Sequence, residues 1–96
     1  MARLMIEYTV DDWAGWKAMF EQDPLRRESL GALGHEIFQV ADDPRRFLLA
    51  IDFDTVDHAL AFRKLAQTQA TWRRSGAGQS WILERSERKT YQGTFL

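Results

Sequence analysis

The two histidines of this chain are its first candidates for chemistry, because imidazole is the side chain whose unperturbed charge changes near neutral pH. His58 lies four residues before Phe62, at the edge of an apolar stripe with helical spacing. At that place His58 could act as a base or a ligand beside a pocket between a helix and a sheet. The alternative is a residue of the first helical turn that faces water.

His35 offers a second candidate, in partnership with a carboxylate. If the hairpin loop consists of the four residues 42–45, counting back along the two strands pairs His35 with Asp52. Such a pair could raise the pKa of the imidazole and form an acid–base couple. A loop of three residues would reverse the alternation and separate the two side chains. His58, His35 and Asp52 are therefore the predicted catalytic residues.

Three carboxylates, Glu7, Asp52 and Glu84, are expected on one face of the sheet. Converging carboxylates are typical of hard-metal or acid–base sites. The alternative is pairing with arginines such as Arg3 and Arg85, and the absence of any metal-ligand spacing favours it. The sequence therefore predicts neither a metal site nor a cofactor.

Aromatic side chains are the candidates to line a ligand-binding pocket. Tyr8, Trp13 and Trp72 are the predicted ligand-binding residues, on the wall of a cleft that would hold a flat apolar molecule. Trp16 and Trp81 are expected in the hydrophobic core. The alternative for all of these rings is that they simply fill the interior of a small protein.

The elements that must position these residues follow from the hydrophobic pattern. Alternation from Arg3 to Val10 predicts a strand, and Asp11 or Asp12 is a suitable cap for the helix that follows. Asp23 and Pro24 would restart a short helix. Strands are expected at 35–41, 46–53 and 80–86, and a second helix at 56–74. The order βαββαβ predicts an α+β, ferredoxin-like fold in which two helices cover one face of a four-stranded antiparallel sheet.

Composition excludes several classes of function. The 96 residues carry a net charge of −1 and contain no cysteine. Disulfides and thiolate chemistry are thereby excluded, and no basic excess attracts nucleic acid or a membrane surface. No apolar run is long enough to span a bilayer. The chain is expected to be cytoplasmic, with residues 1–87 as a single domain and 88–96 as a tail.

The face of the sheet opposite the helices is expected to be partly apolar. Phe47, Leu49, Ile51, Trp81 and Leu83 are placed under the helices, whereas Met5, Leu48, Ala50 and Ile82 are left on the opposite face. A solvated sheet face is normally polar, so a second copy of the chain is expected to cover it, as a homodimer. Tyr91, Gly93 and Phe95 alternate like an edge strand and predict a tail that reaches the partner subunit.

These residues resemble the dimeric α+β-barrel superfamily, in its antibiotic-biosynthesis-monooxygenase-like and cyclase-like branch. The resemblance covers roughly residues 3–87. Its carriers are residues 10–17 with Phe20, the pair Arg26-Arg27, Gly34-His35, residues 41–44, and residues 51–53 with Ala59 and Phe62.

The resemblance implies a fold more than an activity. It implies a cofactor-independent monooxygenase or cyclase-like enzyme that acts on a small aromatic or polyketide-like molecule. Such an enzyme would need a base, and the candidates identified above are His58 and the His35–Asp52 pair. The alternative is a dimer without turnover that binds a ligand or responds to stress. Haem-degrading members of the superfamily use an asparagine, and this chain has none.

Overall fold

A four-stranded antiparallel sheet with helices on one side forms the body of the protein. The computed structural model describes residues 1–93, except for the side chain of Arg73. Along the chain lie β1 (Ala2–Thr9), α1 (Trp13–Gln22), the 3-10 turn η1 (Arg27–Leu30), β2 (Ala32–Val40), β3 (Asp43–Phe53), α2 (Val56–Gln67), α3 (Thr71–Arg74) and β4 (Ala77–Glu84). The strand order is β2-β3-β1-β4. The predicted ferredoxin-like α+β architecture is confirmed.

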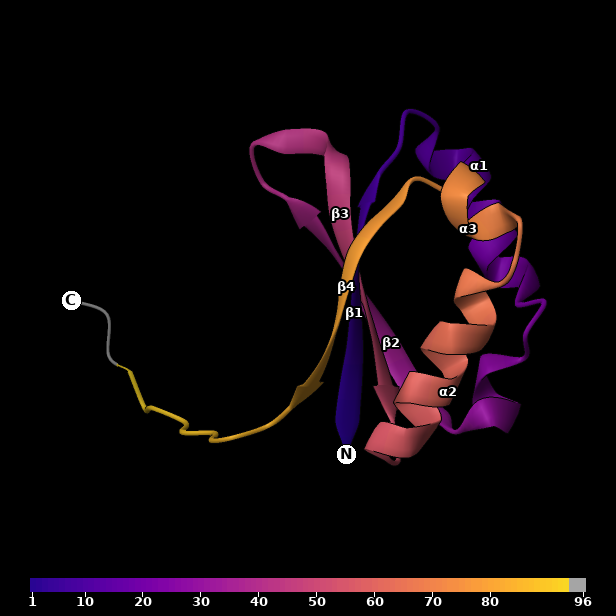
Figure 1. Ribbon diagram of the computed structural model, residues 1–96. Helices are drawn as coiled ribbons and strands as arrows, with labels where there is room; N and C mark the ends of the chain where they lie inside the picture. The colour runs from indigo at the N-terminus through magenta and orange to yellow at the C-terminus, as the bar shows by residue number, and fades with distance from the viewer. Residues whose placement is uncertain (94–96) are drawn as a thin grey trace.

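The helices and the C-terminal segment lie on opposite sides of the sheet. Figure 1 shows α1, α2 and α3 on one side, and the chain after β4 running away on the other. We call these sides the helix face and the back face. The tail prediction concerned residues 88–96, of which Phe95 lies outside the described residues. Tyr91, within them, is 79% exposed.

The two main helices begin where the sequence predicts, and the second of them ends earlier than predicted. The side chain of Asp12 accepts a hydrogen bond from the Gly15 N–H at 3.0 Å and starts α1. The short helix expected from Pro24 is reduced to η1. The helix expected at 56–74 is two pieces, because the Thr68 hydroxyl donates to the Leu65 carbonyl at 2.6 Å and the chain turns before α3.

Alternate residues of the two central strands build the core. Leu4, Ile6 and Tyr8 of β1 are buried on the helix face. They lie opposite Ile51, Leu49 and Phe47 of β3, respectively. On the helix face, Trp16 and Phe20 of α1 and Ala59 and Phe62 of α2 complete the core.

The sequence-based prediction of which β4 side chains face the helices is wrong. Ile82 pairs with Leu4 and packs against the core, so Trp81 and Leu83 lie on the back face, 42% and 44% exposed. Trp81 is therefore not a core residue, and Glu84 shares the face of Ile82 rather than that of Asp52. Residues 81–83 are apolar in succession, and alternation alone cannot decide which side of such a strand faces inward.

The register of the β2–β3 hairpin also differs from the four-residue loop considered above. Val40 pairs with Asp43, and the next pair is Gln39 with Phe47, so residues 44–46 form an insertion in β3. His35 consequently pairs with Ile51, and Gly34 pairs with Asp52. A slip of one residue reverses the face of every side chain, so His35 lies on the helix face and Asp52 on the back face.

Candidate functional site

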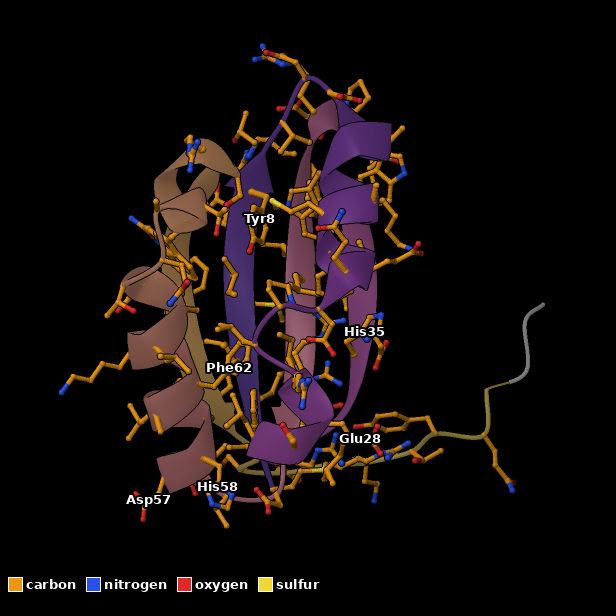
Figure 2. The ribbon with its side chains drawn as sticks, turned by 90° about the vertical axis from the view of Figure 1, so that its right-hand side faces the viewer. Tyr8, Glu28, His35, Asp57, His58 and Phe62 are labelled. Carbon is orange, nitrogen blue, oxygen red and sulfur yellow. The ribbon has the colours of Figure 1, made fainter. Side chains whose placement is uncertain are left out.

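A cavity of about 100 Å³ lies on the helix face, between the helices and the two central strands. Figure 2 looks onto this face, with Tyr8 and Phe62 in the gap between the helices. We call it the central cavity. Its walls are Ile6, Tyr8, Met19, Phe20, Arg27, Leu49, Ile51, Phe62, Ala66, Gln69, Thr71, Trp72 and Ser75. The walls are thus mainly apolar and aromatic, with a few polar groups to orient a ligand.

Tyr8 is one of these polar groups. It lies near the end of β1 and is only 7% exposed. Burial raises the pKa of the Tyr8 phenol to about 12, against the opposing effects of a hydrogen bond with Ser75 and the charge of Arg27. The phenol therefore keeps its proton at neutral pH and can act as a hydrogen-bond donor rather than as a base.

Arg27 reaches the cavity through an unusual turn. Asp23 and Arg26 have φ angles of 49° and 53°, in the left-handed region that few residues other than glycine adopt. Each such residue costs on the order of 1–3 kcal/mol, and such costs concentrate at functional sites. The carboxylate of Asp23 accepts from the Arg27 N–H at 2.9 Å and fixes the turn. The strained turn thus places the side chain of Arg27 at the wall of the central cavity.

The side chain of Arg27 is largely covered by the protein, with 16% of its surface exposed. Its guanidinium lies 3.8 Å from the centre of the Phe20 ring, donates to the Phe20 carbonyl at 3.1 Å, and lies 3.2 Å from Asp23 Oδ1. A guanidinium has five N–H donors, more than these two acceptors use. Burial lowers the pKa of Arg27, because its charge has lost water. The group is suited to bind an anionic oxygen.

An aromatic cluster supports this end of the cavity. Trp16 stacks on Phe20 with ring centres 5.1 Å apart and meets Phe47 edge-on at 4.5 Å. Tyr8 stacks on Phe47 at 5.1 Å. The predicted core position of Trp16 is confirmed, since it is 5% exposed. Close packing of these rings holds Tyr8 and Phe20, and through Phe20 it holds Arg27.

The predicted ligand-binding residues separate into two groups. Tyr8 and Trp72 line the central cavity. Trp13 lies outside it, 46% exposed, and stacks on the outer side of Trp16 with ring centres 5.6 Å apart. A ligand-binding role for these three side chains stays a prediction.

His58 lies at the other end of the molecule from Tyr8 (Figure 2). Its Nδ1 is 2.6 Å from Asp54 Oδ1, and both groups are exposed. This hydrogen bond is the main reason that the pKa of Asp54 is below its usual value. His58 borders a separate hollow of about 420 Å³ between η1 and α2. A base there would act outside the central cavity.

His35 and Asp52 do not form the couple considered from the sequence. His35 packs edge-on against Phe20 with ring centres 4.9 Å apart, and borders an open hollow beside Arg27. Asp52 binds Arg3 on the back face through two hydrogen bonds of 2.8 and 3.0 Å, which lower the pKa of its carboxyl. The structure thus brings none of the three predicted catalytic residues together.

The back-face carboxylates are paired with arginines, as the alternative reading of the sequence holds. Glu7 accepts from Arg46 at 2.7 Å, and Arg3 binds Glu36 at 3.0 Å in addition to Asp52. Among residues 1–93 no group of three or more His, Cys, Asp and Glu side chains is arranged to hold a metal ion. Within the same part of the chain, no helix is long and apolar enough to cross a membrane.

Sequence reasoning missed Arg27 as a site residue and used it only, with Arg26, as part of the family resemblance. The residues just before Arg27 do indicate a turn that could place it. Asp23 stands four positions before Arg27, and Pro24 separates it from α1, a combination that predicts a fixed turn rather than a free helix surface. Only the structure reveals that this turn points inward.

Comparison with known proteins supports the fold. No family model and no curated protein matches the chain. Among solved structures, it is similar to a Bordetella bronchiseptica protein provisionally named an antibiotic biosynthesis monooxygenase (23% identity, 90% of this chain and 97% of that chain, TM-score 0.66).

Two further structures connect the fold with dimers and with an oxygenase. One is a dimeric ferredoxin-like protein from an uncultured marine organism (9% identity, coverage 92% and 97%, TM-score 0.61). The other is a variant of SnoaB, a cofactor-independent oxygenase from Streptomyces nogalater (15% identity, coverage 91% and 94%, TM-score 0.62). These similarities support the ferredoxin-like α+β fold that the sequence predicts.

Proposed function

We propose that the central cavity binds a small, flat aromatic molecule through an acidic oxygen, and that it acts on this molecule as a cofactor-independent monooxygenase. One observation carries the proposal: the largely covered side chain of Arg27 on the wall of an apolar cavity. A desolvated charge beside the donor Tyr8 favours a ligand that ionises to an enolate or phenolate.

The proposed chemistry needs no group beyond substrate and oxygen. A CH₂ that is conjugated with a carbonyl through an aromatic ring loses a proton, and Arg27 and Tyr8 stabilise the enolate oxygen. The carbanion carbon gives its electrons to O₂ and forms a hydroperoxide, which loses water to leave a ketone. The sum is CH₂ plus O₂ giving C=O plus H₂O, with all electrons supplied by the substrate. The described oxygenase activity of SnoaB, a protein of the same fold, supports testing this reaction.

Anthrone is a suitable probe of turnover, because its central CH₂ is acidic and its product is the quinone. We expect oxygen uptake with anthrone, reduced at least about 100-fold in Arg27→Met, since loss of one donor to an oxyanion typically costs that much. Arg88→Ala, in the exposed tail, is the matched control and should leave the rate unchanged. Equal rates in Arg27→Met and Arg88→Ala would refute the oxyanion role of Arg27.

The same assay tests the predicted bases. If His58 or His35 accepts the substrate proton, His58→Ala or His35→Ala should lower the rate. Both histidines lie outside the lining of the central cavity, so we propose instead that the proton leaves to solvent. Retention of the full rate by both variants supports this route.

Binding without turnover is the second candidate function. The small volume of the central cavity and the position of both histidines favour it. p-Nitrophenol distinguishes the two, because its absorbance reports its own ionisation. We expect its apparent pKa to fall on binding to the wild type and not with Arg27→Met. A lowered ligand pKa without oxygen uptake from anthrone would establish the binding role alone.

We further propose that two copies associate through their back faces. Three large apolar side chains, Phe38, Trp81 and Leu83, are each more than 40% exposed there, beside the partly covered Met5 and Leu48. Exposed apolar surface of this kind marks an interface. Two proteins of similar fold are described as dimeric, which supports self-association. The tail, which leaves on the back-face side (Figure 1), would then reach the partner subunit.

Light scattering at micromolar concentration tests the dimer. We expect twice the chain mass of 11.2 kDa for the wild type and a monomer for Trp81→Glu, which would bury a carboxylate in the interface. Leu60→Glu, at an exposed apolar position of α2, is the matched control. Removal of residues 88–96 should weaken the dimer if the tail reaches the partner. A wild-type monomer would refute the dimer outright.

A further inference from the structure

The central cavity is smaller than the ligand proposed for it. Its volume is about 100 Å³, whereas an apolar cavity that holds benzene measures about 150 Å³. Ordinary ligand pockets run from about 300 to 1,000 Å³. An aromatic molecule with polar substituents therefore enters only if part of the wall moves outward, and that part must be one that the hydrophobic core does not hold in place.

One stretch of the wall is held less firmly than the rest. Residues 68–76, which we call the strap, run from the end of α2 through α3 to β4 (Figure 1) and supply Gln69, Thr71, Trp72 and Ser75 to the lining. Residues 68–71 are exposed, and of the described side chains of the strap only Trp72 packs against the core. A helix as short as α3 is not stable by itself. The strap is therefore the part of the wall that opens at the lowest cost.

Both ends of the strap are fixed to neighbouring elements. At its start, the Thr68 hydroxyl donates to the Leu65 carbonyl at 2.6 Å, where α2 ends. At its other end, the Gly76 carbonyl accepts from the Thr9 N–H at 3.1 Å. Gly76 has a φ of 84°, and a Cβ there would lie 2.2 Å from the Thr9 carbonyl oxygen, so this contact with β1 requires glycine. The strap is thus tethered to α2 and β1, and its middle is the part that can move.

A hydrogen bond between Tyr8 and Ser75 holds the strap over the cavity. The Ser75 hydroxyl donates its one proton to the Trp72 carbonyl at 2.6 Å, so towards Tyr8 its oxygen can only accept. The Tyr8 phenol, which is hydrogen-bonded to Ser75, is then the donor, and it too has a single proton. A ligand oxygen that takes the proton of Tyr8 therefore breaks the bond between β1 and the strap.

We propose that the strap is the lid of the central cavity and that the hydrogen bond between Tyr8 and Ser75 is its latch. The lid opens to admit an aromatic ligand, which then replaces Ser75 as the acceptor of the Tyr8 proton. The inference rests on the proposed function, because only a ligand larger than the cavity requires the opening. It follows that the population of the open lid limits entry of the ligand, and that Ser75 competes with the ligand for Tyr8.

Rotation of a single side chain is the competing explanation. Met19 lines the cavity from α1 and is half-buried, and methionine side chains adapt readily to irregular spaces. Rotation of Met19 would enlarge the cavity without moving the strap or breaking the bond to Ser75. The two explanations differ in whether Ser75 affects entry of the ligand and whether Trp72 moves.

Stopped-flow measurement of p-nitrophenol binding separates these explanations. Ser75→Ala removes the latch, and we expect the association rate constant to rise about fivefold, which corresponds to the roughly 1 kcal/mol of a typical hydrogen bond. Tyr8→Phe should raise it similarly and should also raise the dissociation rate constant, because the ligand loses its donor. Ser86→Ala, at an exposed position after β4, is the matched control and should bind like the wild type. A faster association in Met19→Ala but not in Ser75→Ala would establish the competing explanation.

Nuclear magnetic resonance tests the lid without any ligand. Trp72 lies on the strap, and Trp16 lies in the buried aromatic cluster of α1, so relaxation dispersion of their two indole N–H signals compares the two places in one sample. We expect exchange on the microsecond-to-millisecond timescale at Trp72, enlarged in Ser75→Ala, and none at Trp16.

The outcomes distinguish failure of the lid from failure of the site. Absence of exchange at Trp72 in both the wild type and Ser75→Ala, or equal association rate constants for p-nitrophenol in these two proteins, overturns the lid and leaves the Arg27 site intact. Failure of p-nitrophenol to bind to the wild type or to any variant overturns the proposed function and, with it, the role of the lid in ligand entry.

Discussion

The two faces of this sheet use the same residue types for opposite purposes. On the helix face, Arg27 is mostly buried, with Asp23 as its carboxylate partner and Tyr8 beside it. On the back face, Arg3 binds two carboxylates, Glu36 and Asp52, in contact with water. Desolvation lowers the pKa of Arg27, whereas hydrogen bonds with two carboxylates raise that of Arg3. Burial, more than residue type, therefore distinguishes the two arginines.

The same contrast holds for apolar side chains in a single strand. Phe47 and Leu48 are neighbours on β3 and point to opposite faces. Phe47 is 2% exposed and belongs to the aromatic cluster under Tyr8, whereas Leu48 is only partly covered. The helix face is covered within one chain, whereas the back face leaves large apolar side chains exposed.

The largest effect expected is the loss of Phe47. Phe47→Ala should lower the free energy of unfolding by about 3–5 kcal/mol, as for other buried aromatic residues. Leu48→Ala should cost about 1 kcal/mol or less in the monomer, because much of its surface is already in water. Urea unfolding measures both. A cost for Leu48→Ala that grows with protein concentration would place Leu48 in the dimer interface, and equal costs at all concentrations would break the contrast between faces.

Tyr8 should produce the next largest effect, at alkaline pH. Its pKa is raised to about 12, from 10 in the unfolded chain. The unfolded state therefore loses its proton first, and stability should fall as pH rises from 10 to 12. A shift of two pKa units corresponds to about 2.7 kcal/mol. Tyr8→Phe should remove this fall, as urea unfolding at pH 9 and pH 12 would record.

A spectrophotometric titration sharpens the same prediction. The wild type is expected to show a phenolate transition near pH 12 that is absent from Tyr8→Phe. A single transition near pH 10 in the wild type would mean that Tyr8 is not buried as the structure has it.

The sequence predicts which side of a strand faces the core only where one side is clearly apolar. Alternation in β1 and β3 predicted the core face correctly, because those strands have one clearly apolar side. The same rule failed for Trp81, since residues 81–83 are apolar in succession. It failed for His35 because an insertion of three residues in β3 changes the register, and no local pattern announces it.

The candidate site was less predictable than the fold. The sequence favours the two histidines as bases because of their pKa range, yet His58 is exposed and His35 borders an open hollow. The feature that singles out Arg27 is desolvation, which arises only from packing. Tyr8 and Trp72 were selected as cavity residues from the sequence because aromatic residues of a small α+β core must lie near any cavity it has.

A smaller effect is expected on the back face at acid pH. Arg3 holds the pKa of Asp52 below its usual 3.8. Depression of a carboxyl pKa adds stability above the unfolded pKa, which is lost as pH falls through the folded value. Because this pair is partly in water, the contribution should be at most about 1 kcal/mol. Asp52→Asn should remove it, and thermal unfolding at pH 6 and pH 2.5 measures the change.

The smallest effect concerns the exposed pair of Asp54 and His58. The pKa of Asp54 is lowered mainly by its hydrogen bond to the imidazole, so the sign is the same as for Asp52, with a smaller size because solvent screens both groups. The proton position is the sharper observable. With Asp54 as acceptor, the neutral ring of His58 should carry its proton on Nδ1, and Nε2 should be the free base. In Asp54→Asn the more common Nε2–H form should return, as nitrogen-15 spectra would reveal. An Nε2–H ring in the wild type would mean that Asp54 does not orient His58.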